Sequence, residues 1–349
     1  MSELPTRASR KAPKKPMSGS RKALIILAVI ALVLVGGVAG VLAVVRHSID
    51  SQITHIPNAI PSASQSGATE SVQSDSSGQS DSKGSVVNFL VMGSDSRESG
   101  GDPKNWQYGA QRSDVLMIVQ LTADRTGVNV MSIPRDSWVP IPDHGTAKIN
   151  AAFSWGGAQL TIKTVEQLTG IHIDHFAVVD FTSFEQMTDE LGGVTISTSA
   201  GEQTMNGTQA LKFVRERYTL PRGDFDRVRR QQAWIKAIMA KVFEKDVLTS
   251  PTKVTSLTKI LMANSAVDDS MNADTMISMA LGMRNLRSGG VEFMTAPVDG
   301  TGTSSDGQSI VNLNMDLMKS LCDAWQKDQV KSFVSTHPEI QTLESAPVV

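Results

Sequence analysis

The 349-residue sequence contains a single cysteine, Cys322, and this scarcity excludes two kinds of site. One thiol cannot form an intramolecular disulfide, and it cannot supply a multi-cysteine metal site. Cys322 lies in the run MDLMKSLCDAW, which is typical of a helix packed in a core. We therefore expect this cysteine to be structural.

Several common catalytic motifs are also missing. The chain has no GxxxxGK[ST] or GxGxxG loop, no HExxH zinc motif and no GxSxG nucleophile motif. His172 and His175 are three residues apart, but in GIHIDHFAVVD they lead into an expected strand and do not share a helix face. We interpret both histidines as structural.

The body of the chain lacks the broad basic surface that nucleic-acid binding needs. The formal net charge is −2, and the first 22 residues carry seven basic side chains against one acidic one. Subtracting that excess of +6 leaves −8 for residues 23–349. An acidic body argues against nucleic acid as a partner, because phosphate backbones are bound by extended basic faces.

The N-terminal part has the pattern of a membrane anchor. Residues 1–22 are rich in Lys, Arg, Pro and Ser, and we expect a disordered cytoplasmic tail. Residues 23–45 contain no charge, and 23 residues are enough for a transmembrane helix to cross the ~30 Å hydrocarbon layer. The run is too long for a secretory signal peptide. The positive-inside rule then predicts a single-pass protein of the cell membrane with a cytoplasmic N-terminus and an extracytoplasmic body.

The remainder divides into a linker, one domain and a short tail. Residues 46–84 are rich in Ser, Gln and Gly and are expected to form a disordered linker. Residues 85–335 alternate between short β-rich runs and helical runs, which predicts one α/β layered domain with both faces of its sheet covered. Expected buried strands cover residues 86–93, 115–121, 127–133, 175–181 and 291–298. Expected helices cover residues 159–168, 182–191, 223–245, 251–264, 272–287 and 312–328. Residues 336–349 are expected to be a C-terminal tail.

Two aspartates lie at neighbouring strand ends. Asp95 follows the first strand in GSDSRE, and Asp114 precedes the second in RSDVLM. Polar residues at strand ends of an α/β sheet converge on one edge, where such sheets bind ligands. Each aspartate alone fits a turn cap equally well. As a pair they suit a hard cation such as Mg²⁺ shared with a phosphate.

A stiff loop after the third strand presents further charges. In SIPRDSWVPIP, Pro134 and Pro140 flank Arg135 and Asp136. An arginine held between prolines loses less entropy on binding, which favours a preorganised anion contact. The alternative is that Arg135 pairs with Asp136 or another nearby carboxylate. Lys148 follows in AKINAAFSWGG and, taken alone, is typical of a surface lysine.

Residues 212–232, KFVRERYTLPRGDFDRVRRQQ, concentrate charge. The segment holds six arginines, which crowd donors suited to phosphate oxygens; the alternative is a solvated charged helix. Arg215 and Arg217 would share a face only if their run is extended. A helix starting near Asp224 is expected, N-capped by Asp224 or Asp226. Its flank carries Arg227, Gln231 and Trp234, whereas Arg229 and Lys236 are expected to point into solvent.

Together these motifs resemble the LytR-CpsA-Psr family of cell-wall assembly proteins. The motifs, in order, are GSDSRE, RSDVLM, SIPRDSW, KINAAFSWGG, ELGGV, MNGTQALKFVRER and GDFDRVRRQQ. The resemblance covers about residues 86–241. It implies the family's mixed-sheet fold, with a hydrophobic groove for a polyprenyl tail.

The resemblance also implies the residues of the site. The family's metal-binding aspartates fall on Asp95 and Asp114, for Mg²⁺ with Mn²⁺ as an alternative. Its pyrophosphate-binding basic residues fall on Arg112, Arg135, Lys148, Arg215, Arg217 and Arg227, with Asp224 and Gln231 in support. Asp95, Arg135 and Arg217 are the expected catalytic residues. Asp226 departs from the pattern, because the family commonly has glycine there.

The resemblance implies an activity outside the membrane. The expected enzyme is a Mg²⁺-dependent phosphotransferase that moves a wall glycopolymer, such as a teichoic acid, from a polyprenyl-pyrophosphate carrier onto peptidoglycan. Two alternatives stay open. One is a hydrolase that cleaves the same pyrophosphate with water, and the other is a non-catalytic module that binds anionic polymer or lipid.

Overall fold

The computed structural model describes residues 43–61, 84–94, 113–216, 219–248 and 250–349. Residues 45–349 form one compact unit around a seven-stranded sheet with the order β1-β10-β7-β2-β3-β4-β11. Its strands are β1 (Thr54–Ile56), β2 (Val87–Ser94), β3 (Ser113–Leu121), β4 (Val128–Ser132), β7 (His175–Asp180), β10 (Ser265–Asp268) and β11 (Val291–Thr295). Strands β2, β4, β7 and β11 run in one direction, and β1, β3 and β10 run in the other. The predicted mixed central sheet is confirmed.

The sheet has a hydrophobic core on each face, and the strand sequences explain why. Leu116 and Ile118 of β3 pack into one core, whereas Val115 and Met117 pack into the other. Successive side chains of a strand point to opposite faces, so an uninterrupted apolar run serves both layers. The strands expected at residues 86–93, 115–121, 127–133, 175–181 and 291–298 correspond to β2, β3, β4, β7 and β11.

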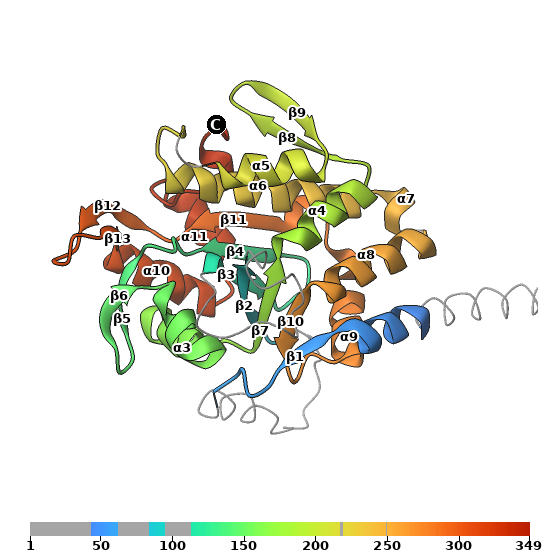
Figure 1. The fold of residues 1–349 in the computed structure, drawn as a ribbon, viewed down its shortest axis with the longest axis horizontal. Helices are drawn as coiled ribbons and strands as arrows, with labels where there is room; N and C mark the ends of the chain where they lie inside the picture. The colour runs from blue at the N-terminus through green and yellow to red at the C-terminus, as the bar shows by residue number, and fades with distance from the viewer. Residues whose placement is uncertain (1–42, 62–83, 95–112, 217–218, 249) are drawn as a thin grey trace, which may run out of the picture. The chain divides into compact units, whose positions relative to one another are not determined.

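Helices cover both faces of the sheet (Figure 1). One face packs against α3 (Ala151–Thr169), α10 (Met315–Gln326), α11 (Val330–Thr336) and the hairpin of β5 (Trp138–Ile141) and β6 (Gly145–Lys148). The other packs against α4 (Phe181–Glu190), α5 (Gly207–Arg215), α6 (Asp224–Val242) and the hairpin of β8 (Val194–Thr198) and β9 (Gly201–Met205). Further elements are α7 (Lys245–Leu248), α8 (Pro251–Ala263), α9 (Ala273–Gly282), β12 (Val298–Thr303), β13 (Ser309–Leu313) and the 3₁₀ turns η4 (Met283–Asn285), η5 (Ser288–Gly290) and η6 (Leu343–Ser345).

The expected N-cap of α6 is wrong. Gly223, with a positive φ of 53°, occupies the N-cap position and makes no side-chain cap bond. Asp224 and Asp226 instead lie in the first helical turn, where carboxylates also interact favourably with the helix dipole. Their side chains are therefore available to pair with arginines.

The predicted boundary at residue 85 is wrong for residues 46–61. Residues 45–52 are helical, and Thr54 to Ile56 of β1 pair in parallel with β10. Ile49 is buried with Met262 of α8 and Ala273 of α9. Val45 and Ile49 share one helix face and Ile53 directly follows the helix, and this apolar spacing outweighs the composition that suggested a linker. No helix within the described ranges is long and apolar enough for a membrane span, and residues 23–42 of the predicted anchor lie outside those ranges.

The C-terminal residues are also part of the fold, contrary to the tail expected at residues 336–349. Thr342 bridges to Met294 of β11, and Val348 bridges to Thr198 of β8. Leu343 and Val348 are buried in the core beneath α6. This segment therefore covers an edge strand of the sheet, a place where natural sheets avoid exposed backbone.

Candidate functional site

The predicted site residues that the structure describes lie at one edge of the sheet. Strands β2, β4 and β7 end at this edge and β3 begins there, because β3 runs antiparallel to β2 and β4. Ser94, the residue before Asp95, pairs with Ser113, the residue before Asp114. The arrangement fits the rule that α/β sheets bind ligands at strand ends.

Five charged side chains form a row at this edge, which we call the charge row: Lys148, Asp136, Arg135, Asp224 and Arg227. Lys148 Nζ lies 3.0 Å from Asp136 Oδ1, and Arg135 Nε lies 3.7 Å from Asp136 Oδ2. Arg135 Nε is also 3.9 Å from Asp224 Oδ1, which in turn pairs with Arg227. Cations and carboxylates thus alternate, and the three cations exceed the two carboxylates by one charge.

The charge row is largely shielded from water. The side chain of Arg227 is 6% exposed and that of Arg135 is 15% exposed. Charges in such positions are costly unless they are paired, and alternation satisfies that requirement. Arg135 therefore has the carboxylate partners that the alternative interpretation expected, and these contacts fix its position without excluding an anion contact.

The loop that carries Arg135 is tied down by backbone hydrogen bonds. The N–H and the Oγ of Ser137 donate to the carbonyl of Pro134, at 3.0 and 2.7 Å. The N–H of Asn150 donates to the carbonyl of Arg135 at 3.3 Å, which joins this loop to the segment that follows β6. Hydrogen bonds within the loop and from Asn150 thus hold the loop in place, in agreement with its predicted stiffness.

Helix α6 is held onto the sheet by Gln232, a residue that the sequence analysis did not single out. Gln232 Nε2 donates to Ser132 Oγ of β4 and to the carbonyl of Met294 of β11, both at 2.9 Å. Its neighbour Gln231 is 4% exposed, and Gln231 Oε1 accepts no hydrogen bond within the part of the chain that the structure describes. The sequence showed only a second glutamine in the run RRQQ, whereas the full burial of Gln232 and its partners are findings of the structure.

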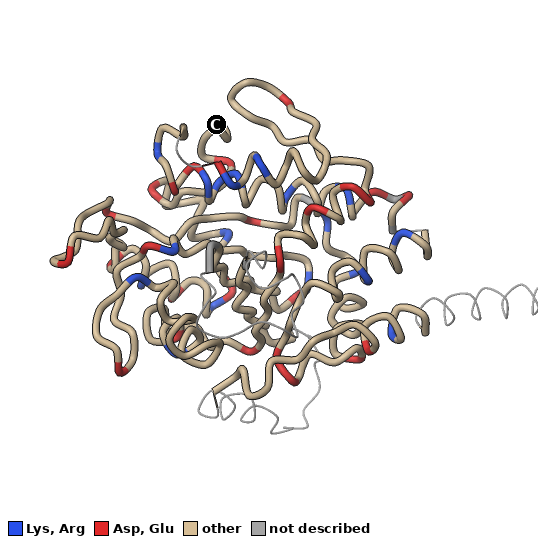
Figure 2. The backbone as a smooth tube through the Cα atoms, in the orientation of Figure 1, with Lys and Arg blue, Asp and Glu red and all other residues tan. Residues whose placement is uncertain are grey.

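Arg215 reaches the same edge from a different helix. It is the last residue of α5, and its guanidinium lies 5.8 Å from the centroid of the Phe181 ring. Phe181 directly follows the last residue of β7, so this cation–π contact places Arg215 beside the strand ends. The run that begins KFVR is helical rather than extended as far as Arg215. Figure 2 shows Lys and Arg positions along α5 and α6.

The expectation that Arg229 faces solvent is wrong. Arg229 is 3% exposed and donates to the carbonyls of Thr342, Leu343 and Ala346 in the C-terminal segment. Burial, followed by repulsion from Arg222, lowers the pKa of Arg229 below its usual range. Lys236 is 41% exposed and pairs with Glu344, as the solvent-facing prediction requires.

Arg222, Arg230 and Asp226 make structural contacts. The sequence indicated no role for the two arginines, and Asp226 departs from the family pattern. Arg230 donates to the carbonyl of Phe213 at 2.8 Å and to that of Val349 at 2.5 Å. Asp226 is 1% exposed and accepts from the Arg222 side chain at 2.6 and 2.9 Å and from its backbone N–H at 2.9 Å. Asp226 therefore closes the turn before α6 and is paired with Arg222 rather than with the charge row.

Part of the predicted site lies outside the description. Asp95, Arg112 and Arg217 fall outside the described residues, and Asp114 is described only by its backbone in β3. Across the described side chains, no group of three or more His, Cys, Asp or Glu residues is placed to hold a metal ion. The predicted metal ligands Asp95 and Asp114 therefore stay a prediction.

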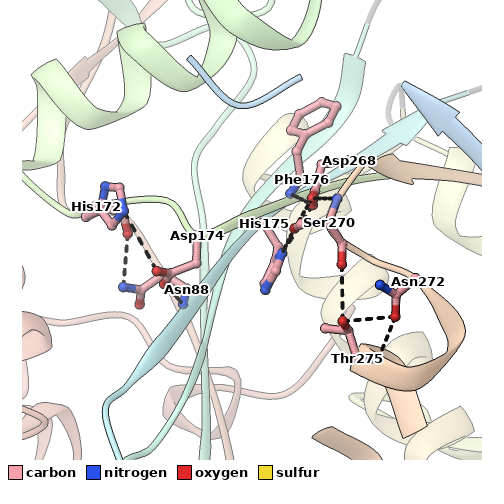
Figure 3. A network of polar contacts seen from close by, with 9 residues as sticks. All are labelled: Asn88, His172, Asp174, His175, Phe176, Asp268, Ser270, Asn272 and Thr275. Carbon is pink, nitrogen blue, oxygen red and sulfur yellow. Dashed lines mark hydrogen bonds and ion pairs between the residues drawn. The ribbon is translucent and has the colours of Figure 1, made fainter. Parts of the chain in front are cut away.

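His172 and His175 lie at the opposite edge of the sheet, in the polar network of Figure 3. His175 Nδ1 is 3.3 Å from Asp268 Oδ2, and Asp268 also accepts from the Phe176 N–H at 3.0 Å. Asp174 Oδ2 accepts from the Asn88 N–H at 2.7 Å. These contacts join β2, β7 and β10, which agrees with the structural interpretation of both histidines.

The same network shifts the pKa of one of its members, Asp268. Burial raises the pKa of the Asp268 carboxyl, but hydrogen bonds from His175, Ser270 and the Phe176 N–H outweigh it and lower that pKa below its usual value. A cavity of about 500 Å³ opens beside the network and is lined by Asp174 and Asp268 among others. No lysine or arginine appears among its described lining residues, so it does not suit a pyrophosphate.

Fold and candidate site together define an α/β protein with a row of alternating charges at its strand ends. The LytR_cpsA_psr family model matches residues 53–327 of the chain. This protein belongs to that family, as its motifs predicted. The match begins at the residue before β1, which agrees with the corrected N-terminal boundary.

Two curated relatives illustrate the similarity. Cell wall biosynthesis protein LcpA of Corynebacterium glutamicum is 29% identical over 285 residues, which cover 66% of this chain and 54% of LcpA. Regulatory protein MsrR of Staphylococcus aureus is 30% identical over 258 residues, which cover 68% of this chain and 74% of MsrR. The chain thus spans about half the length of LcpA.

Solved structures share the fold. Bacillus subtilis TagT aligns with a TM-score of 0.54 at 23% identity, over 73% of this chain and 95% of TagT. Bacillus subtilis TagV aligns with a TM-score of 0.57 at 23% identity, over 71% of this chain and 98% of TagV. At this level of identity the likeness establishes the architecture.

Proposed function

We propose that this protein is a membrane-anchored, extracytoplasmic phosphotransferase that moves a glycopolymer from a polyprenyl-pyrophosphate carrier onto peptidoglycan. The observation that carries the proposal is the charge row, which presents three cations held in place by two carboxylates at the strand ends. The cell wall biosynthesis name of LcpA and the solved structure described as "TagT bound to LI-WTA" support the same direction.

The alternation of charges suits a pyrophosphate ligand. Unit charges about 4 Å apart interact by about 4 kcal/mol at an effective dielectric constant of ~20, so adjacent unpaired arginines would repel strongly. Asp136 and Asp224 offset that repulsion and fix the positions of the two guanidinium groups. The excess positive charge of the row, added to that of Arg215, then favours an anion.

We assign roles to the described residues as follows. Arg135 and Arg227 bind the pyrophosphate oxygens, and Lys148 and Arg215 add positive charge at the margins. Asp224 orients both arginines, since it is paired with Arg227 and lies near Arg135. Gln231 Oε1 is placed to accept a hydrogen bond from a ligand hydroxyl, because it lies one helical turn beyond Arg227.

A divalent cation fits the proposal through the strand register. The pairing of Ser94 with Ser113 brings together the chain positions next to Asp95 and Asp114. Two carboxylates supply the oxygen ligands that Mg²⁺ prefers. When bound, Mg²⁺ would neutralise charge on the pyrophosphate.

The transfer step makes a specific demand on the arginines. An acceptor hydroxyl attacks the sugar-linked phosphorus, a new phosphorus–oxygen bond forms, and the polyprenyl phosphate leaves with the electrons of the broken bond. Negative charge therefore grows on the leaving group, where Arg135 and its neighbours stabilise it. Arginine suits this role because its planar fork can contact two oxygens at once.

The decisive test replaces Arg135. We expect Arg135→Ala to lower the rate of glycan transfer by about 10²- to 10³-fold, and Arg135→Lys to restore part of it. The assay follows a labelled polyprenyl-pyrophosphate glycan, peptidoglycan and Mg²⁺ with the full chain, because β1 lies well before the predicted domain start. Arg284→Ala is the matched control, since Arg284 is an exposed arginine just before β11, at the opposite edge.

Product analysis separates the proposal from its alternatives. An unchanged transfer rate in Arg135→Ala would refute the assigned role. Release of free glycan phosphate at the same rate with and without peptidoglycan would identify a hydrolase. Binding of the donor that survives replacement of both Asp95 and Asp114, with no polyprenyl phosphate released, would identify a non-catalytic module.

The proposed location has its own check. Seven basic residues precede the apolar run of residues 23–45, which supports a cytoplasmic N-terminus and an external body. Protease added outside intact cells should cleave the body and leave an N-terminal epitope tag protected. Protection of the body instead would refute this orientation.

A further inference from the structure

Trp155 is an exposed aromatic side chain in α3, seven residues after Lys148 of the charge row. It is 49% exposed, whereas Trp234 and Trp325 are almost fully buried. Indole is large and apolar, so leaving half of it in water forfeits favourable burial. Single exposed apolar side chains are common on protein surfaces, so the case for a ligand rests on how Trp155 is held and on the segment that carries it.

The position of Trp155 is fixed on two sides. Its ring packs on His144 at the tip of the β5–β6 hairpin, with centroids 5.1 Å apart and planes tilted by 30°. Helix α3 is then broken by Gly156 and Gly157, and Gly157 has a φ of 61° that disfavours other residues. A Cβ on Gly156 would lie 2.6 Å from the Leu160 Cβ. The break thus requires both glycines and holds Trp155 at the end of the first helical turn.

The backbone segment that carries Trp155 begins at Lys148 of the charge row. Lys148, at the end of β6, contacts Asp136, and the Ile149 N–H donates to the carbonyl of Ser137 at 2.8 Å. Asn150, whose N–H donates to the carbonyl of Arg135, precedes Trp155 by five residues, or about 7.5 Å of helical rise. One rigid segment therefore carries both the anion-binding row and the exposed indole.

The chemistry of the proposed donor indicates which group lies next to the pyrophosphate. In the proposed donor, a sugar is bonded directly to the pyrophosphate, so a sugar ring must lie beside the charge row. A pyranose presents an apolar face of C–H groups, which packs well on the flat face of an aromatic ring. Tryptophan loses little conformational entropy in such a contact, because only two side-chain torsions are involved.

We propose that Trp155 is a stacking platform for a pyranose ring of the donor glycan. This inference rests on the proposed function for the identity of the donor. It assigns recognition of the sugar to Trp155 and recognition of the pyrophosphate to the charge row. His144 supports the platform by packing on the indole ring.

The test compares two soluble probes without any acceptor. The probes are farnesyl pyrophosphate bearing one pyranose sugar and bare farnesyl pyrophosphate, titrated calorimetrically into the full chain with Mg²⁺. We expect Trp155→Ala to weaken the glycosylated probe by about 5- to 10-fold and to leave the bare probe unchanged. Trp155→Phe, which keeps an aromatic face, should stay within about twofold of the wild type.

Met315→Ala is the matched control, because Met315 is also 49% exposed but begins α10 and has no assigned ligand role. Three results would overturn the proposal. They are an equal loss for both probes in Trp155→Ala, unchanged binding of the glycosylated probe, or a wild type that binds the glycosylated probe no more tightly than the bare one.

The outcomes also separate this inference from the proposed function. A protein that binds the glycosylated probe through Trp155 but transfers no glycan would refute the transferase and keep the platform. Conversely, if Trp155→Ala leaves donor binding intact and raises only the KM for peptidoglycan, the transferase stands and the platform for the donor sugar is refuted.

Discussion

Arg229 and Lys236 provide a sharp test of the structure, because both were expected on the solvent face of α6. Arg229 is buried and donates to three carbonyls, those of Thr342, Leu343 and Ala346, in the C-terminal segment. Lys236 contacts the same segment only through Glu344, and the two side chains are 41% and 69% exposed. Replacing each residue by methionine removes the charge and the donors but keeps an apolar stem.

The magnitudes for the two variants differ. Hydrogen bonds from a charged donor contribute about 1.5–3 kcal/mol each, but the carbonyls can regain water if the segment loosens, so we expect a loss of about 3 kcal/mol for Arg229→Met. An exposed pair such as that of Lys236 contributes at most about 1 kcal/mol. With a shift of about 2–4 °C per kcal/mol, Arg229→Met should lower Tm by about 6–12 °C, and Lys236→Met by no more than about 4 °C.

The assay combines thermal unfolding with amide hydrogen exchange. The N–H groups of Ser199 and Thr295 donate to the carbonyls of Val348 and Gln341, so their protection reports on the C-terminal segment. Both amides should exchange faster in Arg229→Met than in Lys236→Met. Equal Tm shifts for the two variants, with unchanged protection, would refute the buried position of Arg229.

Two further predictions concern titratable groups away from the site. Burial raises the pKa of the Cys322 thiol to about 12, so the native protein should resist iodoacetamide at pH 8 and react only after unfolding; labelling at the unfolded rate would contradict this. Because the pKa of Asp268 is lowered in the folded state, its stabilisation is present above the ordinary aspartate pKa of about 3.9 and is lost as pH falls through the folded value. Urea unfolding should therefore find Asp268→Asn destabilised most near pH 6–7, with the difference shrinking below about pH 4, and a difference independent of pH would refute the shift.

Much of the central fold could be predicted because its signals are local. The apolar runs that became β3 and β4 are buried on both faces, so composition alone identified them. Helix starts carried sequence markers as well, such as Ser250 before Pro251 at α8. The short hairpins β8–β9 and β12–β13 went unpredicted, because one strand of each, β9 or β12, is polar or glycine-rich and has no apolar periodicity.

What could not be predicted depends on partners distant in sequence. A helical wheel places Arg229 opposite the apolar stripe of α6, but its carbonyl partners lie 113 and more residues further along the chain. The pairing of β1 with β10 likewise joins segments that are far apart in the sequence, with Thr54 opposite Ala266. A local sequence pattern reveals neither contact, because these segments meet only in the folded chain.

The candidate site was also predicted only in part, and the missing part again depends on contacts between distant segments. Family motifs identified Arg135, Lys148 and Arg227 as basic residues, and the structure places them in one row. The sequence offered a pair of Arg135 with Asp136 as an alternative, but it did not predict that Asp224 would join the row, because that depends on the loop after β4 meeting the start of α6. Gln232 explains the meeting, since its amide bonds fix α6 against β4 and β11.

The alternation in the charge row also bears on why the segment around α6 is so rich in arginine. Its arginines have separate roles: Arg227 belongs to the row, Arg222 closes a turn on Asp226, and Arg229 and Arg230 hold carbonyls of the C-terminal segment. Each guanidinium therefore has its own oxygen partners, and the helix tolerates the crowding without a ligand. An anion that binds the row meets arginines whose positions are already set by carboxylates and backbone, so less ordering is required on binding. From the sequence alone, this charge run suggested a solvated helix. In the fold, these four arginines are held by fixed contacts, and one of them, Arg227, belongs to the charge row.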